Sequence, residues 1–178
     1  FDEAKGMTGY QFTYSNPDRN TPYVYYRYLG KLDGLPALYV LSSGGGSGYF
    51  SKIITVMRYE NKLHAVRLLA GGDRCVKGLS KVSMQGETLF YTQNIAPDDF
   101  LEIAHNNPYG LTSEDLVGGP LSCFAEANYK NGLLVSVSIG GEGDEVFLPA
   151  DDEAVAAKYR YQPCFNAIYR DYVSRGLR

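Results

Sequence analysis

The stretch AEANYKNGLLVSVSI, residues 125–139, does more than any other part of the sequence to decide the fold class. Ala125, Ala127 and Tyr129 alternate with other residues up to Lys130-Asn131-Gly132, and Asn-Gly is a strong turn signal. Apolar residues then return at every second position. This period of two predicts an antiparallel hairpin with one buried face. The residues expected on that face are Leu133, Val135, Val137 and Ile139.

The same pattern recurs toward the N-terminus and predicts more hairpins. Runs rich in Tyr, Val, Ile and Thr are separated by turns containing Gly, Asn or Asp. Gly30 is expected to end the first run, and Gly71-Gly72-Asp73 to end the fourth. The expected strands are 23–29, 37–41, 49–59, 63–70, 81–84 and 88–92.

Helical signals occur in two places. Pro97-Asp98-Asp99 is typical of a helix start, because proline suits the first turn and carboxylates favour the positive end of the dipole. Asn106-Asn107-Pro108 is expected to stop that helix. A tail from Asp151 is helical by propensity, meets Pro163 and resumes with helical spacing. We therefore predict one α+β domain over 1–178: an irregular segment 1–22, a body 23–140 dominated by antiparallel sheet, and a broken C-terminal helix at 151–178 packed on it.

Composition excludes several classes of function. The chain has 178 residues, 44% of them hydrophobic, which suffices for one domain with a sizeable core. Its net charge of -3 offers no basic field for nucleic acid. No run approaches the roughly 18 apolar residues of a spanning helix, so no membrane span is expected. The chain begins at Phe1, and we expect an exported protein whose leader has been removed.

Three cysteines without a CxxC pair do not suit zinc or redox chemistry. One disulfide and one spare thiol is the preferred interpretation. Cys75 and Cys123, beside expected strand ends, are the leading pair, and the two pairings with Cys164 are alternatives. A fully reduced set in a cytosolic protein is the competing possibility.

Catalytic signals are sparse, and we predict no catalytic residue, cofactor or metal. His64 falls within a strand and His105 ends a short helix, where each has a structural role. An enzyme could still assemble a site from dispersed carboxylates such as Asp73, Asp98 and Glu102. Glu142, Asp144 and Glu145 could donate oxygens to calcium, although an acidic solvated turn is the simpler interpretation.

The glycine-rich segment Ser42-Ser43-Gly44-Gly45-Gly46-Ser47-Gly48 is the most unusual local feature of the sequence. It lacks the G-K-[ST] and the following helix that a phosphate cradle needs. It could be a flexible hairpin loop or a bulge that lets two sheet edges meet. It could also enter another protein's cleft, with Tyr49 or Phe50 beside it. The residues expected to bind a partner are Ser42, Ser43, Gly44, Gly45, Gly46, Ser47, Gly48 and Tyr49.

Tyrosines 23, 25, 26 and 28 could form an aromatic binding face, but packing within the sheet is the simpler account.

The order of these marked turns resembles a group of small exported bacterial proteins and, more loosely, periplasmic immunity proteins that neutralise peptidoglycan-cleaving toxins of type VI secretion. The resemblance spans residues 36–140. It rests on residues 44–50, Gly71-Gly72-Asp73-Arg74-Cys75, Ser122-Cys123 and Ala127-Asn128-Tyr129. It implies a nonenzymatic periplasmic inhibitor whose loop occupies the toxin's active-site cleft.

The expected partner is therefore a protein, most concretely a peptidoglycan hydrolase such as an amidase. The alternatives are the enzyme with dispersed carboxylates and a structural β domain that binds the cell envelope.

Overall fold

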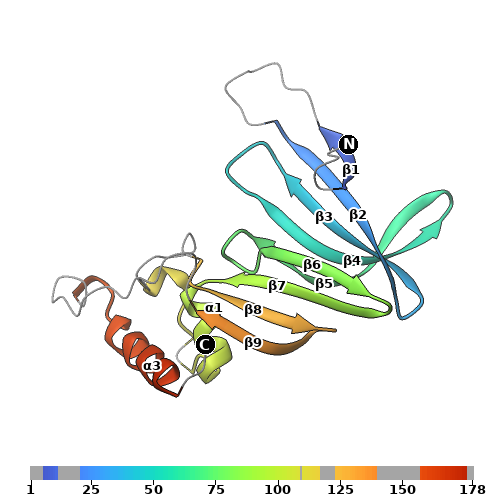
Figure 1. Ribbon diagram of the computed structural model, residues 1–178. Coiled ribbons are helices and arrows are strands. Elements are labelled where there is room, and N and C mark those ends of the chain that lie inside the picture. The colour runs from blue at the N-terminus through green and yellow to red at the C-terminus, as the bar shows by residue number, and fades with distance from the viewer. Residues whose placement is uncertain (1–5, 12–20, 109, 117–122, 140–156, 176–178) are drawn as a thin grey trace.

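The computed structural model describes residues 6–11, 21–108, 110–116, 123–139 and 157–175. They form two antiparallel sheets with helices at one end (Figure 1), in agreement with the predicted α+β class. The strands follow chain order within each sheet. Sheet 1 contains β1 (Thr8–Gln11), β2 (Tyr23–Leu32), β3 (Leu35–Ser43), β4 (Phe50–Tyr59) and β5 (Lys62–Asp73). Sheet 2 contains β6 (Leu79–Gln85), β7 (Thr88–Ile95), β8 (Ala125–Lys130) and β9 (Leu133–Ile139).

In sheet 1, two predicted strand ends are wrong: Gly30 lies within β2, and Gly71-Gly72-Asp73 lie within β5, where they pair with β4. Gly30 does not end β2, because pairing with β3 continues past it after a bulge at Leu29. Its φ of +149° is a conformation that suits glycine. Glycines also lie inside β5, and a Cβ on Gly71 would come within 2.5 Å of the Ser51 carbonyl oxygen. Glycine therefore allows the close approach of two strands here.

Strand β1 lies within segment 1–22, for which the sequence predicts no regular structure. Thr8 to Gln11 pair with Tyr26 to Tyr23 of β2. A Cβ on Gly9 would lie 2.1 Å from the carbonyl oxygen of Val24, so only glycine fits beside β2 at this position. The strand forms because an established neighbour offers its backbone, which local sequence does not reveal.

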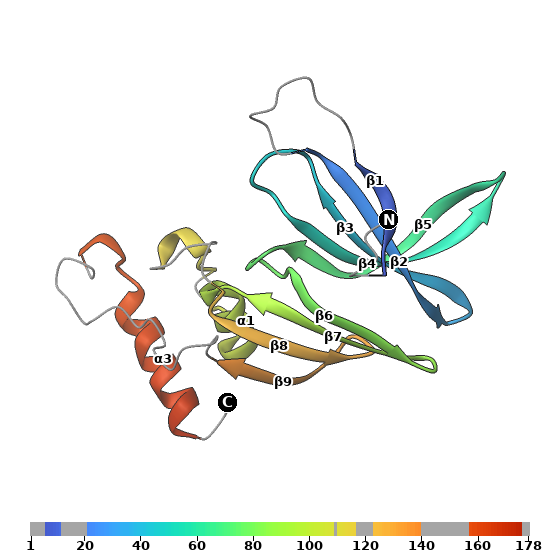
Figure 2. The same cartoon turned by 45° about the horizontal axis from the view of Figure 1, so that its top comes forward.

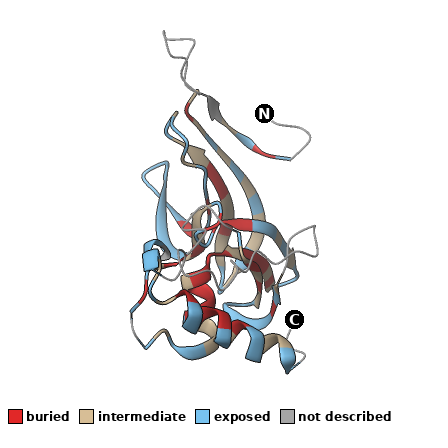
Figure 3. Ribbon diagram, turned by 90° about the vertical axis from the view of Figure 1, so that its left-hand side faces the viewer, coloured by how far each residue is buried: buried red, intermediate tan, exposed pale blue. Residues whose placement is uncertain are grey.

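The main core lies between sheet 2 and two helices, α1 (Pro97–His105) and α3 (Gln162–Ser174). Helix α1 ends as predicted, at Asn106 in the left-handed conformation. Helix α3 has Pro163 in its first turn and packs through Phe165 and Tyr169, which confirms a C-terminal helix on the sheet. Residues 151–156 of the expected tail lie outside the described residues. Buried residues concentrate at this end (Figure 3).

The β8–β9 hairpin forms as predicted, but its buried face is shorter. Val137 is buried, whereas Leu133 and Val135 are 74% and 65% exposed. Val135 is the extra residue at a bulge in β9, so no residue of β8 pairs with it. The main core contacts the other end of the hairpin, around Ala125 and Val137. The expectation that all four alternating residues are buried is therefore wrong for the first two.

The two sheets diverge from a shared joint (Figure 2). A smaller core of Ile53, Ala70, Leu79, Leu89 and Tyr91 lies between them. Polar contacts add to it: Arg27 donates to the Val82 carbonyl oxygen at 3.0 Å, and the Leu79 amide donates to Ser51 Oγ at 2.7 Å. Beyond the joint, the β4–β5 hairpin extends away, and the first seven residues of β5 are exposed.

Candidate functional site

Of the residues predicted to bind a partner, Ser42 and Ser43 belong to the end of β3, where they pair with Val24 and Tyr23 of β2, and residues 44–49 form the loop that joins β3 to β4. The base of this loop is fixed. The Tyr49 amide donates to Asp73 Oδ1 at 2.8 Å, and the Arg74 amide donates to the Tyr49 carbonyl oxygen at 3.2 Å. On the other side, the Gly45 amide donates to Ser43 Oγ at 3.3 Å. Both loop ends are thus held while the middle is open to solvent.

The glycines of this loop are not all required by sterics. A Cβ on Gly44 or Gly46 would meet nothing within 4 Å, and neither residue has positive φ. Gly45, at φ +86°, is the exception in its middle. The structure therefore places the centre of the loop in open space rather than at a tight crossing of two sheets. Ser47 is exposed, and Tyr49 is 36% exposed at its end.

The four tyrosines of β2 do not form one face. Tyr23 and Tyr25 are half-buried and stack at 5.0 Å between ring centroids, with Tyr49 6.4 Å from Tyr23. Tyr26 and Tyr28 point to the opposite, exposed face, because side chains alternate along a strand. The alternative of a single four-tyrosine face is therefore excluded, and Tyr23 and Tyr25 pack with Tyr49 instead.

A small cavity of about 300 Å³ lies under this cluster, between sheet 1 and β6. Arg27 reaches into it, with its guanidinium carbon 5.6 Å from the Tyr39 ring centroid. Burial, reinforced by the nearby Tyr49, raises the pKa of Tyr39 to about 12. Tyr39 is therefore a neutral hydrogen-bonding group here, not a base. The lining residues are Met7, Arg27, Tyr39, Leu41, Tyr49, Leu79, Ser80 and Val82.

The other face of sheet 1, which we call the outer face, is apolar and contiguous with the loop. Strand register aligns Tyr28, Leu38, Ile54 and Leu68 in one row across β2, β3, β4 and β5. Tyr28 and Leu68 at its ends are 58% and 64% exposed. The next row toward the loop contains Tyr26, Val40 and the exposed Lys52, and the row beside the loop contains Val24, Ser42 and Phe50. Apolar side chains therefore reach the loop's base, with Lys52 and Ser42 among them.

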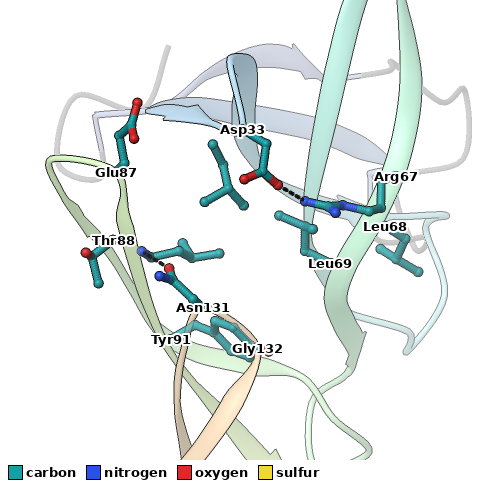
Figure 4. Close-up of a pocket in the computed structure, with 11 residues that line it drawn as sticks. Asp33, Arg67, Leu68, Leu69, Glu87, Thr88, Tyr91, Asn131 and Gly132 are labelled. Carbon is teal, nitrogen blue, oxygen red and sulfur yellow. Dashed lines mark hydrogen bonds and ion pairs between the residues drawn. The ribbon is translucent and has the colours of Figure 1, made fainter.

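The larger hollow is a cleft of about 620 Å³ where the ends of the two sheets meet (Figure 4). We call it the turn cleft, because the β2–β3, β6–β7 and β8–β9 turns contribute to its lining. Arg67 Nη2 lies 2.9 Å from Asp33 Oδ2 on one side, and Glu87 lies on the other (Figure 4). The lining residues are Leu32, Asp33, Arg67, Leu68, Leu69, Glu87, Thr88, Leu89, Tyr91, Asn131 and Gly132.

The joint between the sheets is cross-linked. Cys75, between β5 and β6, forms a disulfide with Cys123, just before β8, which confirms the leading predicted pair. Cys164 is free and exposed. Beside the joint, Lys77 Nζ lies 3.1 Å from Asp99 Oδ1 of α1. Burial raises the pKa of the Asp99 carboxyl, although Lys77 opposes the shift, and the hydrogen bond to Asp99 raises the pKa of Lys77.

The structure locates the histidines and carboxylates that the sequence offers as candidate catalytic groups. His64 is exposed on β5 with its ring 6.0 Å from that of Tyr59, and His105 is exposed in the last turn of α1. Asp73 accepts from the Tyr49 amide and pairs with Arg74 at 3.4 Å. Asp98 and Glu102 lie on α1. Within the described ranges, no three His, Cys, Asp or Glu side chains are placed to hold a metal ion. Glu142, Asp144 and Glu145 lie outside those ranges.

Sequence reasoning missed the outer face and the turn cleft for different reasons. The alternation of Tyr23, Tyr25 and Arg27 with Val24, Tyr26 and Tyr28 was a usable signal, because it separates the two faces of β2. The turn cleft joins residues from hairpins far apart in sequence, and no local pattern marks it.

Comparison with protein-family models, curated proteins and solved structures found no match to this chain. Among the described residues, no helix has the length and apolar character needed to cross a membrane.

Proposed function

We propose that this protein is a nonenzymatic inhibitor, of the immunity-protein type, that binds a cell-wall hydrolase and fills its active-site cleft with the loop from Ser42 to Tyr49. The observation that carries the proposal is the combination of an open loop centre with a fixed base. The Tyr49–Asp73 and Arg74–Tyr49 hydrogen bonds hold the base, so binding orders few additional residues. Small side chains at the tip allow close approach inside a cleft.

The outer face supports a protein as the partner. Tyr26, Tyr28 and Phe50 are 38%, 58% and 47% exposed, and Val24 and Leu68 adjoin them in the same rows. Because about half of each of these side chains is exposed, and an aromatic side chain has about 150–250 Å² to bury, the patch amounts to roughly several hundred Å², a size that often marks an interface. A partner that takes the loop can cover these residues as well and approach the roughly 800 Å² of a standard interface.

The Cys75–Cys123 disulfide supports export, because disulfides persist in oxidising compartments such as the periplasm. A periplasmic location also brings the protein to the compartment that contains peptidoglycan, the substrate of the proposed partner.

The proposal is tested by inhibition of peptidoglycan hydrolysis. Purified cell-wall amidases are assayed on insoluble peptidoglycan with the wild-type chain, with Ser47→Trp and with Ser83→Trp. Ser83 is an exposed serine on β6, so Ser83→Trp is the matched control. We expect wild type and Ser83→Trp to inhibit at least one amidase, and Ser47→Trp to lose at least about tenfold in potency through steric exclusion.

Thermal unfolding of the free variants is measured in parallel, because an exposed loop change costs within about 0.5 kcal/mol. Equal inhibition by wild type and Ser47→Trp would exclude this loop as the contact. Release of soluble fragments by the chain alone would favour the enzyme with dispersed carboxylates. Cosedimentation with peptidoglycan without inhibition would favour the envelope-binding domain.

A further inference from the structure

The turn cleft has the chemistry of a ligand site that is separate from the loop. We propose that it binds an organic cation carried on an apolar stem, such as an alkylammonium ion or the side chain of a lysine or arginine in a peptide. This inference is independent of the proposed inhibitor function, because the loop residues 42–49 do not line the turn cleft.

The charges around the cleft favour a cation. The charged residues that line it are two carboxylates, Asp33 and Glu87, and one guanidinium, Arg67, so the charged groups of the lining sum to one negative charge. Asp33 is paired with Arg67. Among the residues that the structure describes, Glu87 has no hydrogen-bond or ion-pair partner. A ligand cation would supply that partner, whereas a ligand anion would meet two carboxylates for each guanidinium.

The inner lining suits the stem of such a ligand. Leu89 and Tyr91 are 2% and 6% exposed, and Leu32 and Leu69 are half-buried. The Tyr91 ring stacks on Tyr129 at 4.9 Å, which fixes its orientation. Tyr91 and Leu89 form a fixed apolar floor, and the half-buried Leu32 and Leu69 give the methylene groups of a ligand stem apolar contacts.

The polar groups beside Tyr91 restrict the recognition further. Asn131 Oδ1 already accepts from the Leu89 amide at 2.8 Å, so this carbonyl group serves the β8–β9 turn. The Glu87 carboxylate is therefore the acceptor left for a cation, and the Asp33 carboxylate joins it only when Arg67 is displaced. Figure 4 shows them on opposite sides of the cleft.

Arg67 occupies part of the proposed cation position in the free protein. Its pair with Asp33 is exposed, with 52% and 72% of the two side chains accessible, and such pairs contribute little stability. A ligand cation can therefore compete with Arg67 for Asp33. Removal of Arg67 should therefore strengthen cation binding. If Arg67 instead had a structural role in the cleft, its removal would weaken cation binding or leave it unchanged.

Binding is measured on the full chain by amide chemical shifts of Leu69, Leu89 and Gly132, with three probes that share a six-carbon stem: hexylammonium, hexanol and hexanoate. We expect hexylammonium to bind at least about tenfold more tightly than hexanoate, with hexanol between them. Equal binding of the cation and the anion, or no shift at these amides with any probe, overturns the proposal.

Four variants test which charged side chains of the turn cleft affect hexylammonium binding. Glu87→Gln should weaken hexylammonium binding about three- to tenfold, and its control Glu114→Gln, with the same change in net charge, should not. Arg67→Ala should strengthen it several-fold, and the control Lys62→Ala, an exposed cation on the same strand, should not. All four positions are exposed, and thermal melts verify folding. Weaker binding in Arg67→Ala, or equal effects in variant and control, contradicts the proposal.

A peptide arm identifies the source of the cation. Acetyl-Leu-Lys-amide is compared with acetyl-Leu-norleucine-amide, which lacks the ammonium group. Preference for the lysine peptide over both this control and hexylammonium indicates a protein segment, and preference for hexylammonium indicates a free amine.

Discussion

The two halves of the molecule differ in how much of their β-sheet surface is buried. The closed half, β6–β9 with α1 and α3, surrounds Phe100 with the rings of Phe124, Phe165, Tyr169 and Tyr172, at 5.1–6.4 Å between centroids. The open half, β1–β5, buries one face against β6 and leaves Tyr28, Phe50 and Leu68 exposed on the other. We infer that the closed half supplies stability and that the open half presents binding surfaces.

The first prediction compares a phenylalanine from each half. Phe100→Ala should lower the free energy of unfolding by about 4 kcal/mol, because it leaves a cavity in a fully buried aromatic cluster. Phe50→Ala should cost less than about 1 kcal/mol, because that ring is 47% exposed. Urea unfolding of both variants measures the difference. Similar losses would show that the open half contributes as much stability as the closed half.

The second prediction concerns the joint. Cys75→Ser/Cys123→Ser removes a cross-link between residues 48 apart. We expect a loss of about 3–4 kcal/mol, because the chain-entropy model gives about 4 kcal/mol for such a loop and removal of a native disulfide typically costs about 2–5 kcal/mol. Cys164→Ser is the control and should leave stability unchanged, since this thiol is free and exposed. In the unreduced, denatured wild type we expect one reactive thiol, located at Cys164 by peptide mapping; three thiols would contradict the disulfide, and a label on Cys75 or Cys123 would contradict the pairing.

The third prediction is that replacing a buried threonine by valine raises stability in the open half and lowers it in the closed half. Thr55 of the open half is fully buried, and its Oγ1 has no hydrogen-bond partner, so Thr55→Val should stabilise the protein by about 1 kcal/mol. Thr92 of the closed half donates to Asn128 Oδ1 at 2.8 Å, so Thr92→Val should cost about 1 kcal/mol or more. Thermal and urea unfolding measure both. A loss in Thr55→Val would indicate that its hydroxyl is satisfied in solution.

The fourth prediction is the smallest and concerns pH. Because burial raises the pKa of Asp99 above its ordinary value of 3.8, the folded protein holds this proton more tightly than the unfolded chain does. Its stabilising contribution is present at low pH and is lost as pH rises through the folded pKa. Wild type should therefore gain stability relative to Asp99→Asn as pH falls from 7 toward 4. Urea unfolding across this range tests it, and the opposite slope would mean that Lys77 dominates.

The sequence was most informative where the signals were local. The β6–β7 and β8–β9 turns, the start of α1 at Pro97 and its stop at Asn106 all follow from neighbouring residues. It was least informative where one segment depends on a distant one. Strand β1 needs β2 as a template, and Gly30 continues β2 only because β3 accommodates a bulge.

The candidate sites divide in the same way. The loop from Ser42 to Tyr49 is recognisable from composition, and the Cys75–Cys123 pair from the position of both residues beside strand ends. The carboxylate that anchors Tyr49 belongs to Asp73, 24 residues away, so the sequence could not assign that role. The turn cleft depends on the convergence of three turns, which is a property of the whole fold.

The pairing of β4 with β5 bears on how this protein avoids aggregation. β5 is the last strand of sheet 1, and an exposed apolar edge is a template on which further chains can add. Its register shifts leave Leu69 and Val66 as extra residues within the strand. Each bulge interrupts the regular spacing of amide and carbonyl groups along the free edge. An incoming strand can therefore pair only over short runs, which lets the open half display apolar side chains without seeding a continuous intermolecular sheet.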